Sequence, residues 1–281
     1  MTDSFEARGE FSPADSFSDA APEVLGTALA AEAVEASEAA EAVVAQPNGI
    51  MQLGLAPELL RSIADLGYTQ PTSVQAQAIP LAMPSGEAGE VAKFIDLMVS
   101  SQTGSGKTAA FLLPVLHTLL TQQAQAEADE RAEFERAVAD AAAKGEPAPK
   151  RPKRKDPTNS RNFKAAQPGA LIVCPTRELA QQVAHDAIGL VQHCRGLRVA
   201  NIVGGMPYQL QIAKLQNANL VVATPGRLLD LQRSMQIKLD QVQFLVVDEA
   251  DRMLDLGFSD DLAEINQLTI ARKQTMMFSA T

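Results

Sequence analysis

Residues 95–108 have the sequence Ile-Asp-Leu-Met-Val-Ser-Ser-Gln-Thr-Gly-Ser-Gly-Lys-Thr. The apolar run from Ile95 to Val99 has the length of a buried strand, and residues 109–120 have the composition of a helix. Glycines between them would let backbone N–H groups wrap around phosphates, and the following helix N-terminus adds partial positive charge. We therefore predict a nucleotide-phosphate site formed by Ser101, Gln102, Thr103, Gly104, Ser105, Gly106, Lys107 and Thr108.

Two side chains of this loop carry specific chemistry. Lys107 would reach the β- and γ-phosphates, and the Thr108 hydroxyl would bind Mg²⁺. The strict form of the pattern has a glycine where Ser101 stands. A glycine-rich turn without a catalytic role is the alternative, but the order of strand, loop and helix favours the phosphate site.

Short apolar runs of strand length recur along the rest of the chain. Turn signals and helix-like stretches follow most of them, a pattern typical of an α/β fold with a mostly parallel sheet covered by helices on both faces. The predicted strands are Ile95–Val99, Ala170–Cys174, Val199–Val203, Leu220–Ala223, Phe244–Val247 and Thr275–Phe278. An earlier apolar pattern with helical spacing runs from Leu53 to Leu66 and stops at Gly67.

Acidic residues follow one of these predicted strands directly. The run Phe244–Val247 leads into Asp248, Glu249, Ala250 and Asp251. An acid at the end of a buried strand can hold the metal of a nucleotide site, so we assign Asp248 to Mg²⁺. Glu249 would orient or deprotonate the attacking water. An acidic helix start favoured by the helix dipole is the alternative.

The net charge of the chain is unevenly distributed. The 281 residues carry a formal charge of −10, which speaks against nucleic-acid binding through an overall positive surface. In residues 1–49, however, many acids stand against a single basic residue, Arg8, so residues 50–281 are almost neutral. We expect residues 1–49 to be a disordered acidic tail, rich in Ala and Glu.

A second unusual stretch covers residues 121–168. It begins with Gln and Ala, continues with charges of both signs, and ends in a basic cluster between Lys150 and Lys155. We predict a surface insert in which a charged helix leads to a flexible basic segment. This basic cluster could contact phosphate groups, or it could be a solvated linker, and the sequence does not decide between the two.

The cysteine content and the N-terminus indicate the cellular setting. Two cysteines, Cys174 and Cys194, are too few for a disulfide framework, and no signal segment is recognisable. No apolar run reaches the ~18 residues that a membrane span requires. We expect a cytoplasmic protein with no membrane association.

Seven motifs in one order resemble those of the DEAD-box RNA helicases. They are Gly67-Tyr68 with Pro71-Thr72-Ser73-Val74-Gln75, the phosphate loop, Pro175-Thr176-Arg177-Glu178-Leu179, Gly204-Gly205, Thr224-Pro225-Gly226-Arg227, Asp248-Glu249-Ala250-Asp251 and Ser279-Ala280-Thr281. The resemblance implies a RecA-like P-loop NTPase domain over residues 50–281, with a Q motif at about 50–79.

The resemblance also implies the nucleotide. Gln75 would bond the adenine edge through both ends of its carboxamide, which predicts ATP rather than GTP. Tyr68 and Thr72 belong to the same binding segment. The family places an aromatic residue upstream to stack on the base, and Ile50 stands at the matching position. Gln75 as an ordinary surface glutamine is the alternative.

The family's RNA-binding motifs match a further set of residues. The positions are Pro175, Thr176, Arg177, Gly205, Thr224, Gly226 and Arg227. Backbone N–H groups and guanidinium donors at such positions hold phosphates without reading base sequence. Thr224 and Pro225 would also suit a plain helix cap with proline at the first position.

The same resemblance implies that Ser279 and Thr281 couple ATP hydrolysis to strand separation. Their hydroxyls would form hydrogen bonds at or near Asp251. A second RecA-like lobe with arginine fingers has no counterpart in the sequence. We therefore expect the chain to bind ATP and RNA but to hydrolyse ATP slowly alone. His185 and His193 are interpreted as helix-face residues rather than metal ligands.

Two other functions stay open. The chain could be a non-catalytic module that recruits RNA or protein partners through its tail or insert. It could also belong to a P-loop DNA helicase or ATPase, because no residue in the sequence identifies a ribose 2′-hydroxyl contact.

Overall fold

The structure is a computed structural model that describes residues 49–86, 92–147, 149–150 and 164–280. The predicted acidic tail, apart from Gly49, lies outside the described residues, as do most of the basic cluster and Thr281. Residues 46–281 form one compact unit, to which all the described residues belong.

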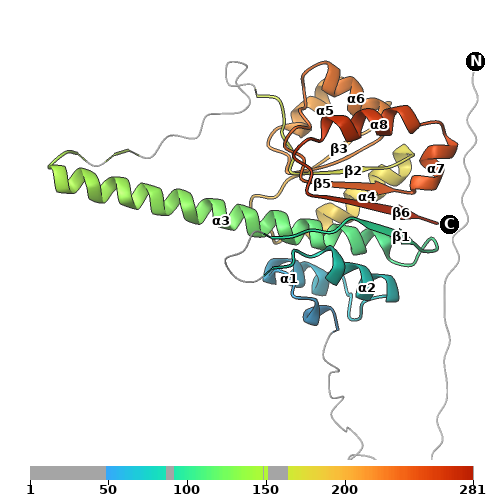
Figure 1. Cartoon of the computed structure of the whole chain (residues 1–281), viewed down its shortest axis with the longest axis horizontal. Helices are drawn as coiled ribbons and strands as arrows, with labels where there is room; N and C mark the ends of the chain where they lie inside the picture. The colour runs from blue at the N-terminus through green and yellow to red at the C-terminus, as the bar shows by residue number, and fades with distance from the viewer. Residues whose placement is uncertain (1–48, 87–91, 148, 151–163, 281) are drawn as a thin grey trace, which may run out of the picture. The chain divides into compact units, whose positions relative to one another are not determined.

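Six parallel strands form a single sheet in the order β1-β6-β5-β2-β4-β3 (Figure 1). The strands are β1 (Leu97–Ser100), β2 (Ala170–Val173), β3 (Val199–Ile202), β4 (Leu220–Ala223), β5 (Phe244–Asp248) and β6 (Gln274–Ser279). The central strands β2, β4 and β5 are buried along their whole length, as expected for a parallel sheet covered on both faces. The predicted α/β class is confirmed.

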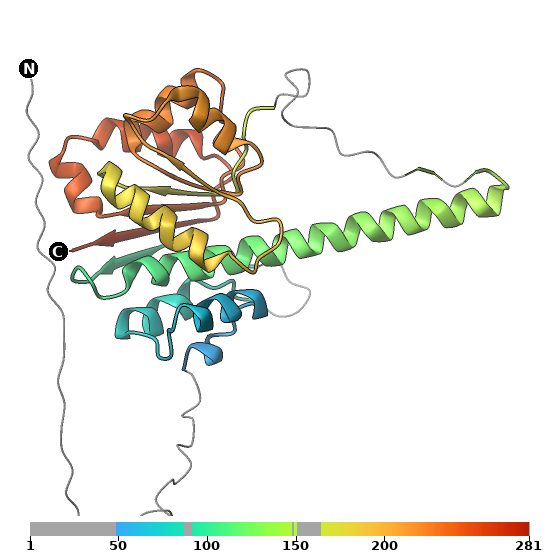
Figure 2. The same ribbon diagram turned by 180° about the vertical axis from the view of Figure 1, so that it is seen from behind.

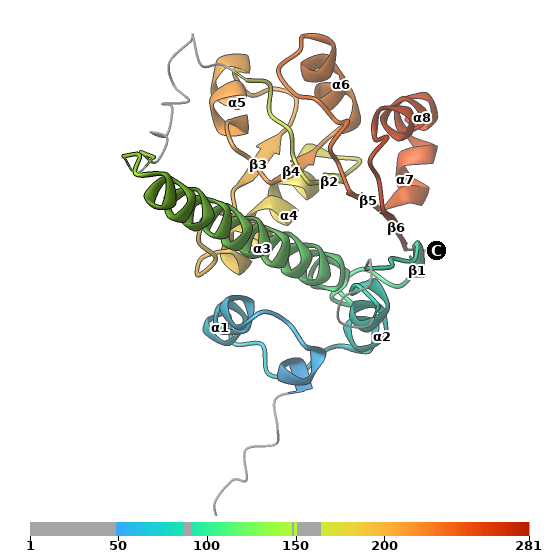
Figure 3. The same ribbon diagram turned by 60° about the vertical axis from the view of Figure 1, so that its left-hand side comes forward.

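Helices cover both faces of this sheet (Figure 3). One core contains η1 (Gly49–Leu53), α1 (Pro57–Asp65), α2 (Ser73–Ala82), the first part of α3 (Lys107–Lys144) and α4 (Arg177–Leu190). The opposite core contains α5 (Tyr208–Leu215), α6 (Pro225–Arg233), α7 (Ala250–Asp255) and α8 (Ser259–Leu268). Alternate residues of the strands belong to the two cores, as the period of two in a strand requires.

The edge strand β1 begins two residues later than the sequence predicts. The side chain of Asp96 explains the shift, because its Oδ1 accepts a hydrogen bond from the backbone N–H of Thr275 at 2.6 Å. A side chain thus takes the place of a ladder bond, and regular pairing starts at Leu97 opposite Met276.

The predicted helix over residues 53–66 is wrong in its extent, because two shorter elements replace it. Gly54 has a positive φ of 70°, which ends η1. Pro57 then starts α1, since proline lacks an N–H and favours the first helical turn.

The insert predicted from residue 121 begins inside an unbroken helix. α3 contains 38 residues and extends well beyond the sheet (Figure 2). Polar pairs one turn apart, such as Gln123 with Glu127 and Gln125 with Asp129, support its outer part. The charged helix expected in the insert is therefore the continuation of the helix that follows the phosphate loop, and it ends at Gly145 in the left-handed conformation.

Candidate nucleotide and RNA site

The predicted functional residues gather at one edge of the sheet. Because all six strands are parallel, their carboxyl ends lie along the same edge, where parallel α/β sheets bind ligands. The sheet order separates the residues further. Predicted nucleotide residues follow β1 and β5, and predicted RNA residues follow β2, β4 and β3.

The phosphate loop connects β1 to α3 with the geometry that its glycines predict. Gly104 and Gly106 have φ values of 81° and 89°, a region that residues with a Cβ rarely adopt. The Ser101 hydroxyl hydrogen-bonds that of Ser105, and the Ser101 N–H donates to the Ser279 carbonyl at 3.1 Å. Ser101, at the position of the missing glycine, therefore braces the loop internally.

Lys107 lies in the first turn of α3. Its ammonium donates to the carbonyl oxygens of Ser101 at 2.7 Å and Ser279 at 3.2 Å, which links the loop after β1 to the end of β6. An ammonium carries three donors, so these two bonds fix its position and leave a third hydrogen for a phosphate oxygen.

Asp248, the last residue of β5, is 4% exposed and accepts a hydrogen bond from the Glu249 N–H at 3.1 Å. Burial, followed by the nearby Glu249 carboxylate, raises the pKa of Asp248 from 3.8 to about 6, although Lys107 opposes the shift. Negative charge is therefore concentrated around one buried carboxylate. Such a group gains from a divalent cation more than an exposed one does.

Glu249 occupies a strained position next to this carboxylate. Its φ of 52° is unusual for a residue with a side chain. Its carboxylate lies 3.2 Å from Arg252 Nη1, one turn further along α7, with the glutamate side chain 20% exposed. The turn at the end of β5 thus presents two adjacent acids in different environments, one buried and one partly solvated.

The Q motif contacts the phosphate loop directly. Thr72 caps α2 by accepting from the Gln75 N–H at 3.3 Å, while Gln75 Oε1 accepts from the Thr72 N–H at 3.0 Å, which is a complete capping box. Gln75 Nε2 donates to the Gly106 carbonyl at 3.1 Å. A Cβ on Gly106 would come within 2.5 Å of that nitrogen, so only glycine permits this contact. The adenine contact of Gln75 stays a prediction.

A cavity of about 480 Å³ brings most of the predicted nucleotide residues together. Those that line it are Tyr68, Thr72, Gln75, Thr103, Gly104, Gly106, Lys107, Thr108, Asp248 and Glu249. Ile50, the residue matched to the base-stacking position, is 3% exposed in the core and does not line this cavity. Tyr68, half exposed, is the aromatic residue of the lining.

The other wall of this cavity comes from α4 and was missed by sequence reasoning. Gln182, His185, Asp186 and Gly189 recur at helical spacing on that helix, which is the signal that could have identified them. Burial raises the pKa of Asp186, and His185 opposes the shift. His185 is thus a cavity residue, beyond its predicted place on a helix face.

The predicted RNA residues converge on the loop after β3. A Cβ on Gly205 would come within 2.7 Å of Arg177 Nη1, so the guanidinium lies against the two glycines of the loop. Arg227 Nη1 donates to the Met206 carbonyl at 3.3 Å, and its Cζ lies 6.0 Å from the centre of the Tyr208 ring. Arginines from the turns after β2 and β4 therefore contact one loop.

The helix starts in this region differ from each other. Thr176 Oγ1 accepts from the Leu179 N–H at 3.2 Å and caps α4, and Pro175 is buried. Thr224 precedes α6 without a side-chain capping bond, so the capping alternative lacks its expected hydrogen bond. Gly226 is exposed in the first turn of α6, beside the partly buried Arg227.

The predicted coupling segment adjoins the acidic turn. The Ala280 N–H donates to Asp251 Oδ2 at 3.3 Å, which joins the end of β6 to α7. Ser279 contributes its carbonyl to Lys107, as described above. Thr281 lies outside the described residues, and its hydroxyl contact stays a prediction.

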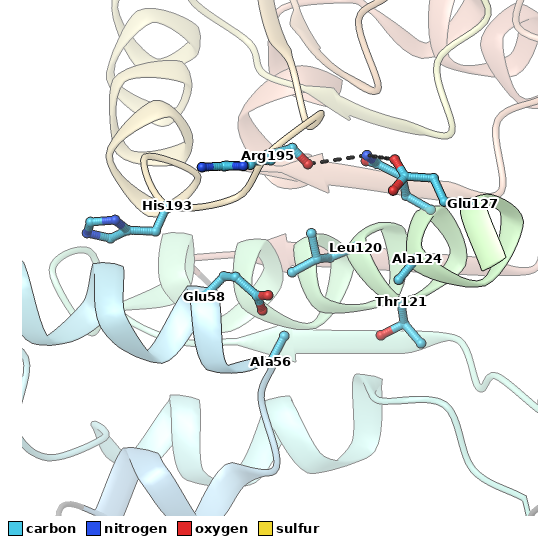
Figure 4. A pocket seen from close by; sticks show the side chains of 9 residues that line it. Ala56, Glu58, Leu120, Thr121, Ala124, Glu127, His193 and Arg195 are labelled. Carbon is cyan, nitrogen blue, oxygen red and sulfur yellow. Dashed lines mark hydrogen bonds between the residues drawn. The ribbon is translucent and has the colours of Figure 1, made fainter. Parts of the chain in front are cut away.

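A second cavity, of about 470 Å³, lies between the start of α1, the middle of α3 and the turn after α4 (Figure 4). Gln123 Nε2 donates to the Arg195 carbonyl at 3.2 Å and to Glu127 Oε1 at 3.0 Å, which fastens that turn to α3. His193 was predicted on a helix face, but it lies in this turn, with Nε2 2.6 Å from Asp65 Oδ2. These contacts join structural elements, and none of the predicted nucleotide or RNA residues lines the cavity.

The sequence profile of the DEAD/DEAH box helicases matches residues 72–281, which include every cavity-lining residue named above except Tyr68. The chain belongs to the DEAD/DEAH box helicase family. Its sheet of six parallel strands with helices on both faces matches the RecA-like fold of that family, as predicted.

Individual relatives agree with this assignment. The chain is 38% identical over 231 residues to "ATP-dependent RNA helicase SrmB" of Haemophilus influenzae, covering 82% of this chain and 42% of the relative. It is 36% identical over 231 residues to "ATP-dependent RNA helicase RhlB" of Pseudomonas aeruginosa, covering 81% and 47%. The chain thus spans less than half the length of these curated relatives.

Solved structures show the same correspondence. A hypothetical ATP-dependent RNA helicase from Sulfolobus tokodaii superposes with a TM-score of 0.57 at 31% identity, over 80% of this chain and 50% of that one. A DEAD-box protein from Methanococcus jannaschii gives 0.56 at 29% identity, over 83% and 50%. In the described part of this chain, no helix is both long and apolar enough to span a bilayer.

We predict that Asp248→Asn stabilises the metal-free protein at neutral pH. The raised pKa of about 6 means that ionising Asp248 costs more in the folded state than in the unfolded state. That cost is absent below about pH 4, where the carboxyl is protonated in both states, and reaches up to about 3 kcal/mol above pH 6. Urea unfolding in EDTA at about pH 4.5, inside the range in which the cost develops, and at about pH 7.5, above it, measures the difference. A stability gain that did not grow with pH would contradict this account.

Proposed function

We propose that this chain is the ATP- and RNA-binding first lobe of an ATP-dependent RNA helicase. The observation that supports it best is the shared edge of the sheet, where the phosphate loop follows β1 and the acidic turn and two arginine-bearing turns follow the adjacent strands β5, β2 and β4. One domain would thus hold a nucleotide and an RNA strand side by side.

ATP would occupy the cavity between the phosphate loop, the Q motif and α4. Lys107 would direct its remaining hydrogen to a phosphate oxygen, and backbone N–H groups from the loop would bond the others. Tyr68 provides an exposed aromatic face at the base end of this cavity, where stacking on adenine is physically reasonable. Because Gln75 is hydrogen-bonded to Gly106, adenine binding at Gln75 would affect the conformation of the phosphate loop.

The residues present also fit Mg²⁺. Asp248 and Thr108 supply oxygen donors within one cavity, and within the described residues no cluster of three or more His, Cys, Asp or Glu side chains could hold a metal unaided. Mg²⁺ prefers one or two carboxylates together with substrate phosphates, which matches such a sparse protein contribution. When bound, the ion would neutralise phosphate charge. Glu249 would orient or deprotonate the attacking water.

RNA would bind along the turns after β2, β4 and β3. Arg177 and Arg227 offer guanidinium donors, and the exposed Gly205 allows a phosphate to approach the main chain. Contacts of this kind bind the backbone of the strand and carry no base specificity. Asp251, Ser279 and Thr281 would couple this surface to the ATP site.

Hydrolysis and unwinding would require a second RecA-like lobe that supplies arginine fingers. Such a group contributes on the order of 10³ to 10⁵ in turnover. The chain alone is therefore proposed to bind ATP but to turn it over slowly. We further propose a cytoplasmic location, because Cys174 and Cys194 are both free and buried, as suits a reducing compartment.

Replacing Lys107 by Ala should weaken ATP binding by roughly 10- to 100-fold, because one charge-assisted hydrogen bond is lost. Lys273→Ala serves as the control, since Lys273 is exposed beside the amino end of β6, at the opposite edge of the sheet. Calorimetric titration with ATP and Mg²⁺ provides the measurement. Equal affinity of the two variants would show that the phosphate-loop assignment is wrong.

Replacing Arg177 by Ala should weaken binding of single-stranded RNA and leave ATP affinity unchanged. Loss of one phosphate contact should also reduce the slope of log affinity against log salt by about 0.7. Fluorescence anisotropy with oligouridylate at several salt concentrations measures both quantities, again with Lys273→Ala as the control. An unchanged salt slope would exclude a phosphate contact by Arg177.

A further inference from the structure

One buried glutamine, outside all seven motifs, closes the loop on which the two arginines meet. Gln211 of α5 is 0% exposed, and its Nε2 donates to the Val203 carbonyl at 2.8 Å and to the Met206 carbonyl at 3.1 Å. These carbonyls flank Gly204 and Gly205. A single amide group therefore joins the two ends of the glycine pair from the side of the core.

The two hydrogen bonds from Gln211 matter because Arg177 and Arg227 both contact the loop that they hold. Two consecutive glycines have large backbone freedom, and Gly205 already has a positive φ of 83°. The same loop lies against the Arg177 guanidinium, and its Met206 carbonyl accepts from both Gln211 and Arg227. A change in the position of this carbonyl would move the partner of Arg227 directly.

We propose that Gln211 is a positioning residue for RNA binding, which holds the loop from Val203 to Met206 in the shape that presents Arg177 and Arg227 to one strand. This inference rests on the RNA-binding function proposed above. Gln211 itself is buried, so it acts through the loop and does not touch RNA. Without the two hydrogen bonds from Gln211, the loop would sample several conformations. RNA binding would then have to select one of them, and this loss of conformational entropy would lower the affinity.

The chain contains a matched control. Gln274, at the start of β6, is 2% exposed, and its Nε2 donates to the Ile95 carbonyl at 2.8 Å and to the Ala82 carbonyl at 3.3 Å. It therefore resembles Gln211 in burial and in bridging two main-chain carbonyls. It differs in place, because the start of β6 lies at the amino edge of the sheet, away from the predicted RNA residues.

The test compares Gln211→Met with Gln274→Met in the 281-residue chain. Methionine keeps the side-chain length and removes both donors, so both variants should lose similar thermal stability. Gln211→Met should weaken binding of labelled oligouridylate about tenfold, equivalent to the net worth of roughly one to two hydrogen bonds. Gln274→Met should change it less than about twofold, and both should bind ATP like the unsubstituted chain.

The outcomes separate this inference from the proposed function. If the unsubstituted chain does not bind oligouridylate at low salt, the RNA-binding function itself is wrong, and the inference falls with it. If that chain binds but Gln211→Met binds equally well, or Gln274→Met is equally weakened, a positioning role is excluded. Should Gln211→Met not fold, Gln211→Asn compared with Gln274→Asn decides the question by the same criteria.

Discussion

The parallel direction of all six strands is the constraint on which the rest of the structure depends. It places the carboxyl end of every strand at one edge, so that residues as far apart in sequence as Lys107 and Ser279, 172 positions, come into contact. The Lys107 ammonium shows the consequence, since it joins the Ser101 carbonyl just after β1 to the carbonyl of Ser279, the last residue of β6. A sheet with even one antiparallel site strand would place that strand's motif at the opposite edge.

The sheet order also divides this edge into two parts. The predicted nucleotide residues follow β1 and β5, the predicted RNA residues follow β2, β4 and β3, and the boundary runs between β5 and β2. Cys174, just beyond β2, lies at this boundary, and its pKa is raised first by burial and then by Asp248 and Glu249. The two predicted sites therefore meet at a pair of fully buried strands, β2 and β5.

Much of this arrangement could be predicted from the sequence. Buried apolar runs predicted all six strands to within two residues. The glycine-rich and acidic segments after two of these strands predicted the phosphate loop and Asp248, whose roles stay predictions. The sequence could not predict that the Asp96 side chain would accept the hydrogen bond of the Thr275 N–H in place of a main-chain carbonyl and so shift the start of β1. Neither could the α4 wall or the role of Gln211, because these depend on which helices pack beside which loops. The burial of Ile50 could not be predicted either, because it also depends on tertiary packing.

We propose that ATP and RNA bind side by side at the carboxyl edge of one sheet. Amide hydrogen exchange of the 281-residue chain, with a non-hydrolysable ATP analogue and Mg²⁺ or with oligouridylate, tests it most directly. We expect the nucleotide to protect residues 101–108 and 248–251, and RNA to protect residues 175–177, 204–206 and 224–227. Protection of the amino edge by either ligand, with these segments unchanged, would contradict it.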